Sequence, residues 1–333
     1  MNYNEFLEYV EKNLADCYTE VMASEELNEL GDYSKDIDEI KKKYDNCHVM
    51  LQHVVKNNGI ELDAVSIYIE GKHISPNIYL KPFYDSYQMG KPLNFVMMEI
   101  VCQYRRYGDH SDLSIVDVYD FKAVRKDIVI RLVNYERNKE MLKSCPYKLI
   151  LDLAVTFRCI INEDEVGLAS IMITNKEFSK WDVDLEELYQ LALFNTNQRY
   201  PWQMIPISKV VFDCFENRLN ELPPEVVDEI NNLTLNETGV NMFVLTNQSK
   251  VFGAACMLYD NVIRNFARVQ EANIYIMPSS VHEVMLIPED DQTSSEFLQD
   301  LLHEANRSSV GLIDLLSDHI YYYDKDKDKI DIV

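Results

Sequence analysis

The sequence predicts an α+β protein. A mostly helical amino-terminal region over residues 1–144 carries one β-hairpin, and a domain over residues 145–333 follows it with a largely antiparallel sheet and packed helices. Apolar residues at three- and four-residue spacings, typical of amphipathic helices, dominate the first region. Short alternating segments between turn residues, typical of antiparallel strands, dominate the second. A chain of 333 residues has the length of about two domains or of one large domain.

The amino-terminal region contains several helical patterns. Helices are predicted over residues 4–22, 36–44, 75–90 and 92–108. Ser75 and Pro76 fit an N-cap and a first helical position, although Pro82 then falls inside the first turns of that helix.

A β-hairpin is predicted between the second and third of these helices. Residues 49–55 and 65–69 alternate in hydrophobicity on either side of Asn57, Asn58 and Gly59. These three residues tolerate positive φ, so a hairpin is favoured over a continued helix. Turn chemistry accounts for them, and a role in ligand binding is the disfavoured alternative.

Strands and helices alternate in the rest of the chain. Strands are predicted at residues 128–132, 151–161, 168–173, 242–245, 274–277, 284–287 and 321–323, and the five from 151–161 to 284–287 are expected in one sheet. Helices are predicted at residues 138–143, from the Asp184 and Glu187 capping box onward, over 253–269, and from the capping box at 293–296 onward. The tract 199–206 is expected to be a turn or linker, and 324–329 a solvated charged tail.

Charge restricts the classes of partner. The chain has 32 Lys and Arg against 56 Asp and Glu, a net charge of −24. A generic DNA or RNA binder neutralises phosphates with clustered cations, so no nucleic-acid partner is expected. The partner that this charge favours is a basic protein. No apolar stretch reaches the roughly 20 residues of a membrane helix, so no membrane partner is expected either.

The cysteines indicate a reducing compartment. Seven cysteines stand singly without a C-x-x-C motif, which predicts free thiols and a cytoplasmic protein. Cys102, Cys159 and Cys256 have apolar neighbours and are expected to be buried.

The common cofactor motifs are missing from the sequence. It contains no G-x-G-x-x-G, no G-x-x-x-x-G-K-[ST], no H-E-x-x-H and no G-x-S-x-G. We therefore expect no cofactor and no metal. The acidic repeat of 324–328 resembles half of a calcium loop, but Lys329 stands where that loop needs glycine.

The candidate catalytic residues are Ser279, Ser280, His282 and Glu283, between two predicted strands. Hydroxyl, imidazole and carboxylate groups are those that acid–base and nucleophilic catalysis use. His282 would act as general base toward either serine or a water, while Glu283 or another carboxylate orients the ring. The favoured alternative is a structural turn whose side chains satisfy backbone groups. A metal site made of His282, Glu283 and His303 is a further, less favoured alternative.

Several segments carry a resemblance to a known family: residues 56–59, 75–80, 243–247, 253–259 and 278–283. Together they resemble an uncharacterised Firmicute domain-of-unknown-function family over nearly the whole chain. This resemblance implies a soluble bacterial cytoplasmic protein and carries no assigned activity. The middle and last thirds also resemble a second uncharacterised Firmicute family, which implies that about 145–333 forms one α+β unit.

Two classes of function agree with these observations. The first is a non-catalytic binding or accessory protein of the bacterial cytoplasm, favoured by the missing cofactor motifs and the negative charge. The second is a small hydrolase or transferase that uses residues 279–283. A cleft that holds His282 and a second titrating group would favour the enzyme, and an open turn would favour the binding protein.

Overall fold

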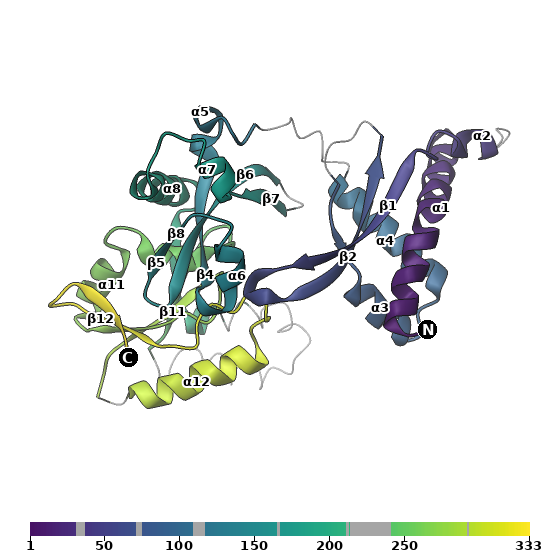
Figure 1. Ribbon diagram of the computed structural model, residues 1–333. Helices are drawn as coiled ribbons and strands as arrows, with labels where there is room; N and C mark the ends of the chain where they lie inside the picture. The colour runs from purple at the N-terminus through teal and green to yellow at the C-terminus, as the bar shows by residue number, and fades with distance from the viewer. Residues whose placement is uncertain are drawn as a thin grey trace. The chain divides into compact units, whose positions relative to one another are not determined.

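The computed structural model describes residues 1–30, 37–70, 75–108, 117–164, 167–210, 213, 241–291 and 293–333. Its helices and antiparallel sheets confirm the α+β class (Figure 1). The chain forms two compact units, of which the first comprises Met1–Lys56, Ile60–Val116 and Ile161–Ala169, and the second Asn57–Gly59, Asp117–Ile160 and Ser170–Val333. Apart from the short segments 57–59 and 161–169, the first unit ends at Val116 and the second begins at Asp117. The domain boundary at 144/145 stays a prediction.

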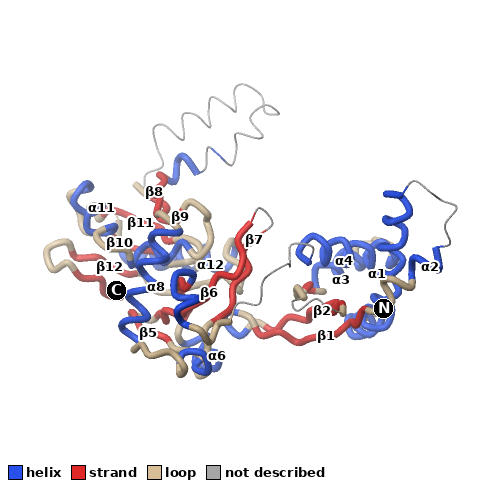
Figure 2. Tube along the Cα trace, turned by 90° about the horizontal axis from the view of Figure 1, so that it is seen from above, coloured by secondary structure: helices blue, strands red, loops and turns tan. Residues whose placement is uncertain are grey.

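The first unit packs helices beside a small sheet (Figures 1 and 2). Its elements are α1 (Tyr3–Leu30), α2 (Ile37–Lys41), β1 (Cys47–Val55), β2 (Glu61–Ile69), β3 (Ile78–Tyr79), α3 (Lys81–Gln88) and α4 (Leu93–Gly108). The sheet order is β1-β2-β3, and α1 packs against both α4 and β1. Phe6, Val10 and Leu14 of α1 are fully buried in the core of this unit, at the spacing that predicted the helix.

The predicted β-hairpin is present. Strands β1 and β2 pair from Cys47 with Ile69 to Val55 with Glu61. Asn58 has a φ of 61° and Gly59 a φ of 68°, the left-handed conformation that asparagine and glycine adopt most readily. Local turn chemistry therefore determines where the chain reverses.

The predicted start of the third helix at Ser75 and Pro76 is wrong. Helix α3 begins one residue before Pro82, which occupies its first turn. Within a helix, proline is tolerated only in the first turn, because the first N–H groups of a helix have no partner within it. The Ser75 hydroxyl instead donates to the Ile67 carbonyl at 2.9 Å.

The second unit contains strands of two sheets, apart from residues 161–169 of β6 and β7, which belong to the first unit. The smaller sheet is formed by β4 (Ile128–Asn134), β5 (Tyr147–Ile150), β6 (Leu153–Asp164) and β7 (Gly167–Met172). The larger one has the order β13-β12-β10-β11-β9-β8, with β8 (Trp202–Pro206), β9 (Phe243–Asn247), β10 (Ile274–Met277), β11 (Val284–Pro288), β12 (Tyr321–Asp324) and β13 (Lys329–Ile332).

The expectation of a single sheet is wrong. Strand β6 pairs with β4 on one edge, Leu153 to Cys159, and with β5 on the other, Leu153 to Thr156. Both edges of this part of β6 are thus occupied, so the later strands assemble separately. Leu151, with a φ of 56°, allows the tight turn that folds β5 back on β6.

The helices of the second unit surround these sheets. They are α5 (Phe121–Val124), α6 (Lys139–Leu142), α7 (Asn175–Phe178), α8 (Leu185–Arg199), α11 (Val262–Gln270) and α12 (Ser295–Ser308), with 3-10 turns at Arg125–Asp127, Glu136–Asn138 and Gly253–Leu258. The predicted capping box that opens α8 is present: Glu187 N donates to Asp184 Oδ1 at 2.8 Å. Helix α12 is capped by Ser294, whose hydroxyl accepts from Phe297 N.

Three local predictions in the second unit are wrong. The helix predicted over 253–269 is divided into a 3-10 turn that ends at Leu258 and helix α11 from Val262, and Asn261, with a φ of 62°, directly precedes α11. The tract 199–206 contains β8, an edge strand that tolerates Pro201 and Pro206 at its ends. The tail predicted at 324–329 is the turn of a terminal β12–β13 hairpin.

The described cysteines are all free. Cys159 and Cys256 are buried as expected, and burial raises the pKa of their thiols to about 11 and about 12. Cys102 is exposed, contrary to expectation, because neighbouring helical positions point about 100° apart and α4 buries Val101 instead. Across the described ranges, no helix is long and apolar enough to cross a bilayer.

Candidate functional site

The candidate segment of residues 278–283 links β10 to β11 and is held by backbone hydrogen bonds to residues 314–317. Val281 N donates to the Asp314 carbonyl at 2.8 Å, and Leu316 N donates to the Ser279 carbonyl at 3.0 Å. Ser279 and Ser280 are buried, 3% and 4% exposed. The segment is therefore a rigid part of the fold.

His282 leaves this buried segment toward solvent. Its Nε2 lies 3.3 Å from Asp314 Oδ1, and its Nδ1 lies 3.4 Å from the backbone N of Phe252. Because the Phe252 N–H donates to Nδ1, the neutral ring carries its proton on Nε2, toward the Asp314 carboxylate. The two side chains are 32% and 43% exposed, so an external molecule can reach the pair.

The serine hydroxyls do not complete a triad with this ring. Ser280 Oγ accepts a hydrogen bond from His282 N at 3.0 Å, a local turn contact. The Nδ1 of the His282 ring contacts Phe252 and the Nε2 contacts Asp314. The carboxylate that accompanies the ring is Asp314, and Glu283 is half-buried in the following position. Catalytic roles for Ser279, Ser280, His282 and Glu283 stay predictions.

Phe252 connects His282 to an arginine. Its ring stacks on the imidazole with centroids 6.2 Å apart and planes at 11°, and the guanidinium of Arg131 lies 4.7 Å from its centroid. The φ of Phe252 is 53°, a strained value for a bulky residue. The next residue, Gly253, packs so closely against Thr246 and the His282 carbonyl that a side chain has no space there.

A second arginine lies on the same sheet face. In the β4–β6 pair Val129 stands opposite Arg158, so Arg131, two residues further along β4, shares the face of Arg158. Arg158 donates from Nε to Ser170 Oγ at 2.8 Å and from a terminal nitrogen to the Ser170 carbonyl at 2.9 Å. Burial lowers its pKa below the ordinary value.

Arg131 lacks such partners. Within the part of the chain that the structure describes, its Nε is buried without a hydrogen-bond partner, and no carboxylate forms an ion pair with it or with Arg158. Burial and the nearby Arg158 charge lower the pKa of Arg131 to about 10, against the opposite effect of Asp314. We call Arg131, Arg158, Phe252, His282 and Asp314 the arginine cluster.

Asparagine side chains position the Asp314 segment. The amide of Asn58 donates to the carbonyls of Leu312 and Leu315, both at 2.8 Å, and that of Asn57 donates to Ile313 at 2.7 Å. Asn58 is itself fixed by Asn138, whose Oδ1 accepts from Asn58 N at 2.8 Å. These residues, treated in the sequence as turn formers alone, hold the backbone that presents Asp314.

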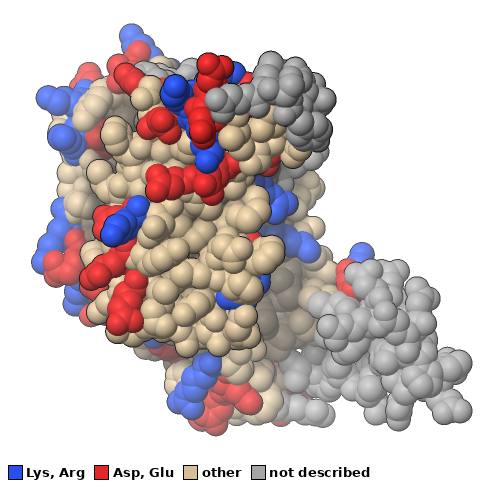
Figure 3. Space-filling model, turned by 90° about the vertical axis from the view of Figure 1, so that its right-hand side faces the viewer, with Lys and Arg blue, Asp and Glu red and all other residues tan. Residues whose placement is uncertain are grey.

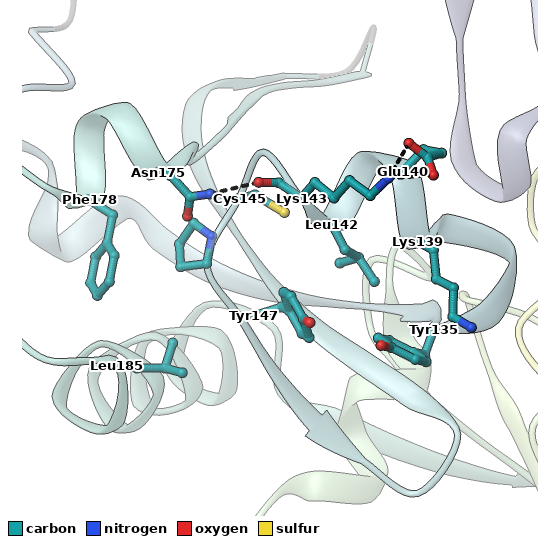
Figure 4. A pocket seen from close by; sticks show the side chains of 11 residues that line it. Tyr135, Lys139, Glu140, Leu142, Lys143, Cys145, Tyr147, Asn175, Phe178 and Leu185 are labelled. Atoms are coloured by element: carbon teal, nitrogen blue, oxygen red, sulfur yellow. Dashed lines mark hydrogen bonds and ion pairs between the residues drawn. The ribbon is translucent and has the colours of Figure 1, made fainter.

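A cavity of about 630 Å³ elsewhere in the second unit has a different character (Figure 4). Figure 4 shows the rings of Tyr135 and Tyr147 in its wall, with centroids 6.0 Å apart. Its lysines are paired: Lys139 with Glu136 and Lys143 with Glu140, both at 2.7 Å. Burial also raises the pKa of the Cys145 thiol to about 11, which makes it a poor nucleophile. This cavity therefore offers no unpaired charge to a ligand.

The described residues contain no group of three or more His, Cys, Asp or Glu that could hold a metal ion. His303 lies on α12, where Gln299 Nε2 is 3.0 Å from its Nε2. The residues of the proposed joint metal site thus form no such group with one another.

Sequence inspection missed Arg131, Arg158, Phe252 and Asp314. One local signal was present: each arginine stands inside an otherwise apolar strand, in Ile130-Arg131-Leu132 and Phe157-Arg158-Cys159. A charge at such a position is seldom buried without a partner. Phe252 and Asp314 gave no signal, since their role depends on contacts between distant segments.

Comparison with known proteins identifies a family whose function is unknown. No curated protein and no solved structure matches the chain. A family model described as "Family of unknown function (DUF5688)" matches residues 3–325. Since that match covers nearly the whole chain, it agrees with the resemblance seen in the sequence, and the protein belongs to DUF5688, a family of unknown function.

Proposed function

We propose that this protein is a non-catalytic binding protein that holds a small oxyanion at the arginine cluster. The observation that carries this proposal is the buried, unpartnered Nε of Arg131 beside Arg158. A buried charge without a partner destabilises a fold, and a bound anion would remove that cost. In a chain with 56 acidic residues, two half-buried arginines that form no ion pair with a described carboxylate are unexpected unless the anion comes from outside.

The geometry favours a planar or tetrahedral oxyanion over a halide. A guanidinium presents several N–H donors in one plane and binds carboxylate or phosphate oxygens in pairs. Ser170 already fixes the orientation of Arg158, and the Phe252 ring supports Arg131 from one side. Asp314 accepts from His282, and its charge only partly offsets the effect of burial on the pKa of Arg131.

We also propose that this protein has a basic protein partner in the bacterial cytoplasm, and the net charge supports this second proposal. Figure 3 shows a face on which acidic and basic side chains are interspersed around an uncharged area. The net charge of −24 repels nucleic acid at long range and attracts basic surfaces.

The alternative is a small hydrolase or transferase, and the His282–Asp314 pair is the observation that favours it. A carboxylate that orients an imidazole is part of many catalytic sites. Catalysis here would require His282 Nδ1 to leave the N–H of Phe252, since Nε2 already faces Asp314. The binding protein needs no such rearrangement and is the function that the geometry supports best.

The decisive experiment titrates phosphate, sulfate and acetate into the full chain at constant ionic strength, by calorimetry. We expect Arg131→Met to weaken binding by about tenfold or more, because it removes a charge-assisted contact and keeps the length of the side chain. Without anion the same variant should melt at a higher temperature, since a buried unpaired charge is gone.

Two further variants complete this experiment. Arg268→Met, at an exposed position of α11, controls for the loss of one positive charge. His282→Ala keeps both guanidinium groups, and a hydrolytic activity lost in this variant would support the enzyme instead. Equal affinity of Arg131→Met and Arg268→Met would refute the proposal.

A further inference from the structure

An apolar stripe lies on the exposed side of α4 in the first unit. Phe95 is 55% exposed, Met98 is 44% exposed and Cys102 is also exposed. Residues three and seven positions apart lie along one side of a helix, so these side chains form a row, which we call the α4 stripe. The core of the unit instead buries Val101 and Tyr104 of the same helix. Single exposed apolar side chains are common, but a contiguous row marks an interaction surface.

The charged residues of α4 nearly cancel one another. Glu99 pairs with Lys91 at 2.7 Å, and Arg105 pairs with Glu25 of α1. Arg106 lies beyond the α4 stripe, in the last turn of the helix. The charge that a partner meets beside the α4 stripe therefore depends on the neighbouring helix, α1.

Helix α1 is strongly acidic. It contains eight acidic residues and one lysine. It packs along α4, where the rings of Tyr18 and Tyr104 have centroids 5.9 Å apart. Asp16 is exposed and forms no ion pair with a described residue. The side chain of Glu20 is 68% exposed and lies 3.4 Å from Lys41.

Cys17 of α1 connects this acidic side to the α4 stripe. Burial, and then the charges of Glu20 and Cys102, raise the pKa of the Cys17 thiol to about 11. Because a charge acts strongly only over a short distance, both groups lie close to Cys17. Asp16 is four residues from Glu20 and therefore shares its side of α1. Negative charge thus flanks the Cys102 end of the α4 stripe.

We propose that the α4 stripe and the acidic side of α1 bind a basic amphipathic helix of a partner protein. The apolar side chains of that helix pack on Phe95 and Met98, and its lysine or arginine side chains lie toward Asp16 and Glu20. This inference rests on the basic partner proposed above and adds the surface that binds it. A second copy of this chain fits less well, because two molecules with a net charge of −24 repel each other.

The test measures the binding of three fluorescent peptides to the full chain by anisotropy. Each has about 18 residues, a length at which an isolated helix can form. The first has leucines along one side of the helix and lysines elsewhere, the second has glutamates in place of the lysines, and the third has the composition of the first in scrambled order. We expect the first to bind at least about tenfold more tightly than the other two, because only it matches both the apolar row and the charge.

Substitutions on α4 and α12 locate the apolar contact. Phe95→Ala should weaken binding of the leucine–lysine peptide by about tenfold, since aromatic side chains contribute most to such interfaces. Phe297→Ala is the matched control, because Phe297 of α12 is 52% exposed and stands outside the α4 stripe. Its affinity for the peptide should equal that of the unmodified protein.

A pair of double variants tests the charge. Asp16→Asn with Glu20→Gln should weaken binding by about threefold at low ionic strength and have little effect at high salt, where exposed charges are screened. Asp300→Asn with Glu304→Gln removes two exposed charges at the same spacing on α12 and should leave the affinity unchanged.

Cys102 gives a direct readout of the surface. The bound leucine–lysine peptide should slow alkylation of this exposed thiol by iodoacetamide several-fold, as measured by mass spectrometry. Binding without protection of Cys102, or equal affinity of Phe95→Ala and Phe297→Ala, would refute this surface and leave the basic partner in place. Equal binding of the glutamate peptide, or binding of no peptide, would refute both. A dimer of the unmodified chain that Phe95→Ala dissociates would assign the α4 stripe to a second copy and overturn the proposal.

Discussion

Gly253→Ala is expected to destabilise the second unit by about 3 kcal/mol or more, because the added methyl group has no space. A Cβ at this position would lie 2.3 Å from Thr246 Oγ1, 2.4 Å from the His282 carbonyl oxygen and 2.9 Å from Asn247 N. Two of these atoms are backbone, so rotating a side chain cannot make space. The change also displaces His282, because the Thr246 hydroxyl donates to the His282 carbonyl at 2.7 Å.

Urea denaturation followed by circular dichroism measures this effect. Gly311→Ala is the matched control: its Cβ would meet only Asp314 Oδ2, at 3.4 Å, and the expected change is within about 0.5 kcal/mol. If Gly253→Ala unfolds at the same urea concentration as the Gly311→Ala control, the tight packing beneath His282 is not what the structure describes.

Asn58→Ala is expected to cost about 3 kcal/mol. Its amide donates to the carbonyls of Leu312 and Leu315, and its Oδ1 accepts from Asn138 Nδ2 at 3.0 Å. Losing these bonds leaves partly buried groups unsatisfied, at about 2 kcal/mol in total. Alanine at a φ of 61° adds about 1 kcal/mol of backbone strain.

A second substitution separates these two contributions. Asn58→Gly removes the amide but tolerates the positive φ, so it should cost about 2 kcal/mol. Asn265→Ala, at an exposed position of α11, is the control for loss of an asparagine. Wild-type stability of Asn58→Gly would show that the amide bonds to residues 312–315 contribute nothing to the fold.

Local signals in the sequence predicted a large part of the fold. The β1–β2 hairpin follows from residues that accept positive φ at its turn, and α8 begins where Asp184 and Glu187 form their capping box. Both depend on residues close together in the chain. The division of the later strands into two sheets depends instead on β5 occupying the second edge of β6, a contact that no periodicity records.

The site was predictable only in part for the same reason. His282 drew attention because hydroxyl, imidazole and carboxylate groups follow one another there, yet its ring contacts Phe252, 30 residues earlier, and Asp314, 32 residues later. Arg131 reaches the same cluster from β4. An unpaired buried charge is a property of the folded chain, since every side chain is hydrated before folding.

The most direct test of the central claim is the position of an oxyanion in crystals of the full chain grown with selenate, whose selenium is located by anomalous scattering. We predict a selenate bonded to the guanidinium groups of Arg131 and Arg158 in the unmodified protein, and none there in Arg131→Met. Selenate bound elsewhere while both guanidinium groups bind no anion would contradict the proposal that the arginine cluster is an oxyanion site.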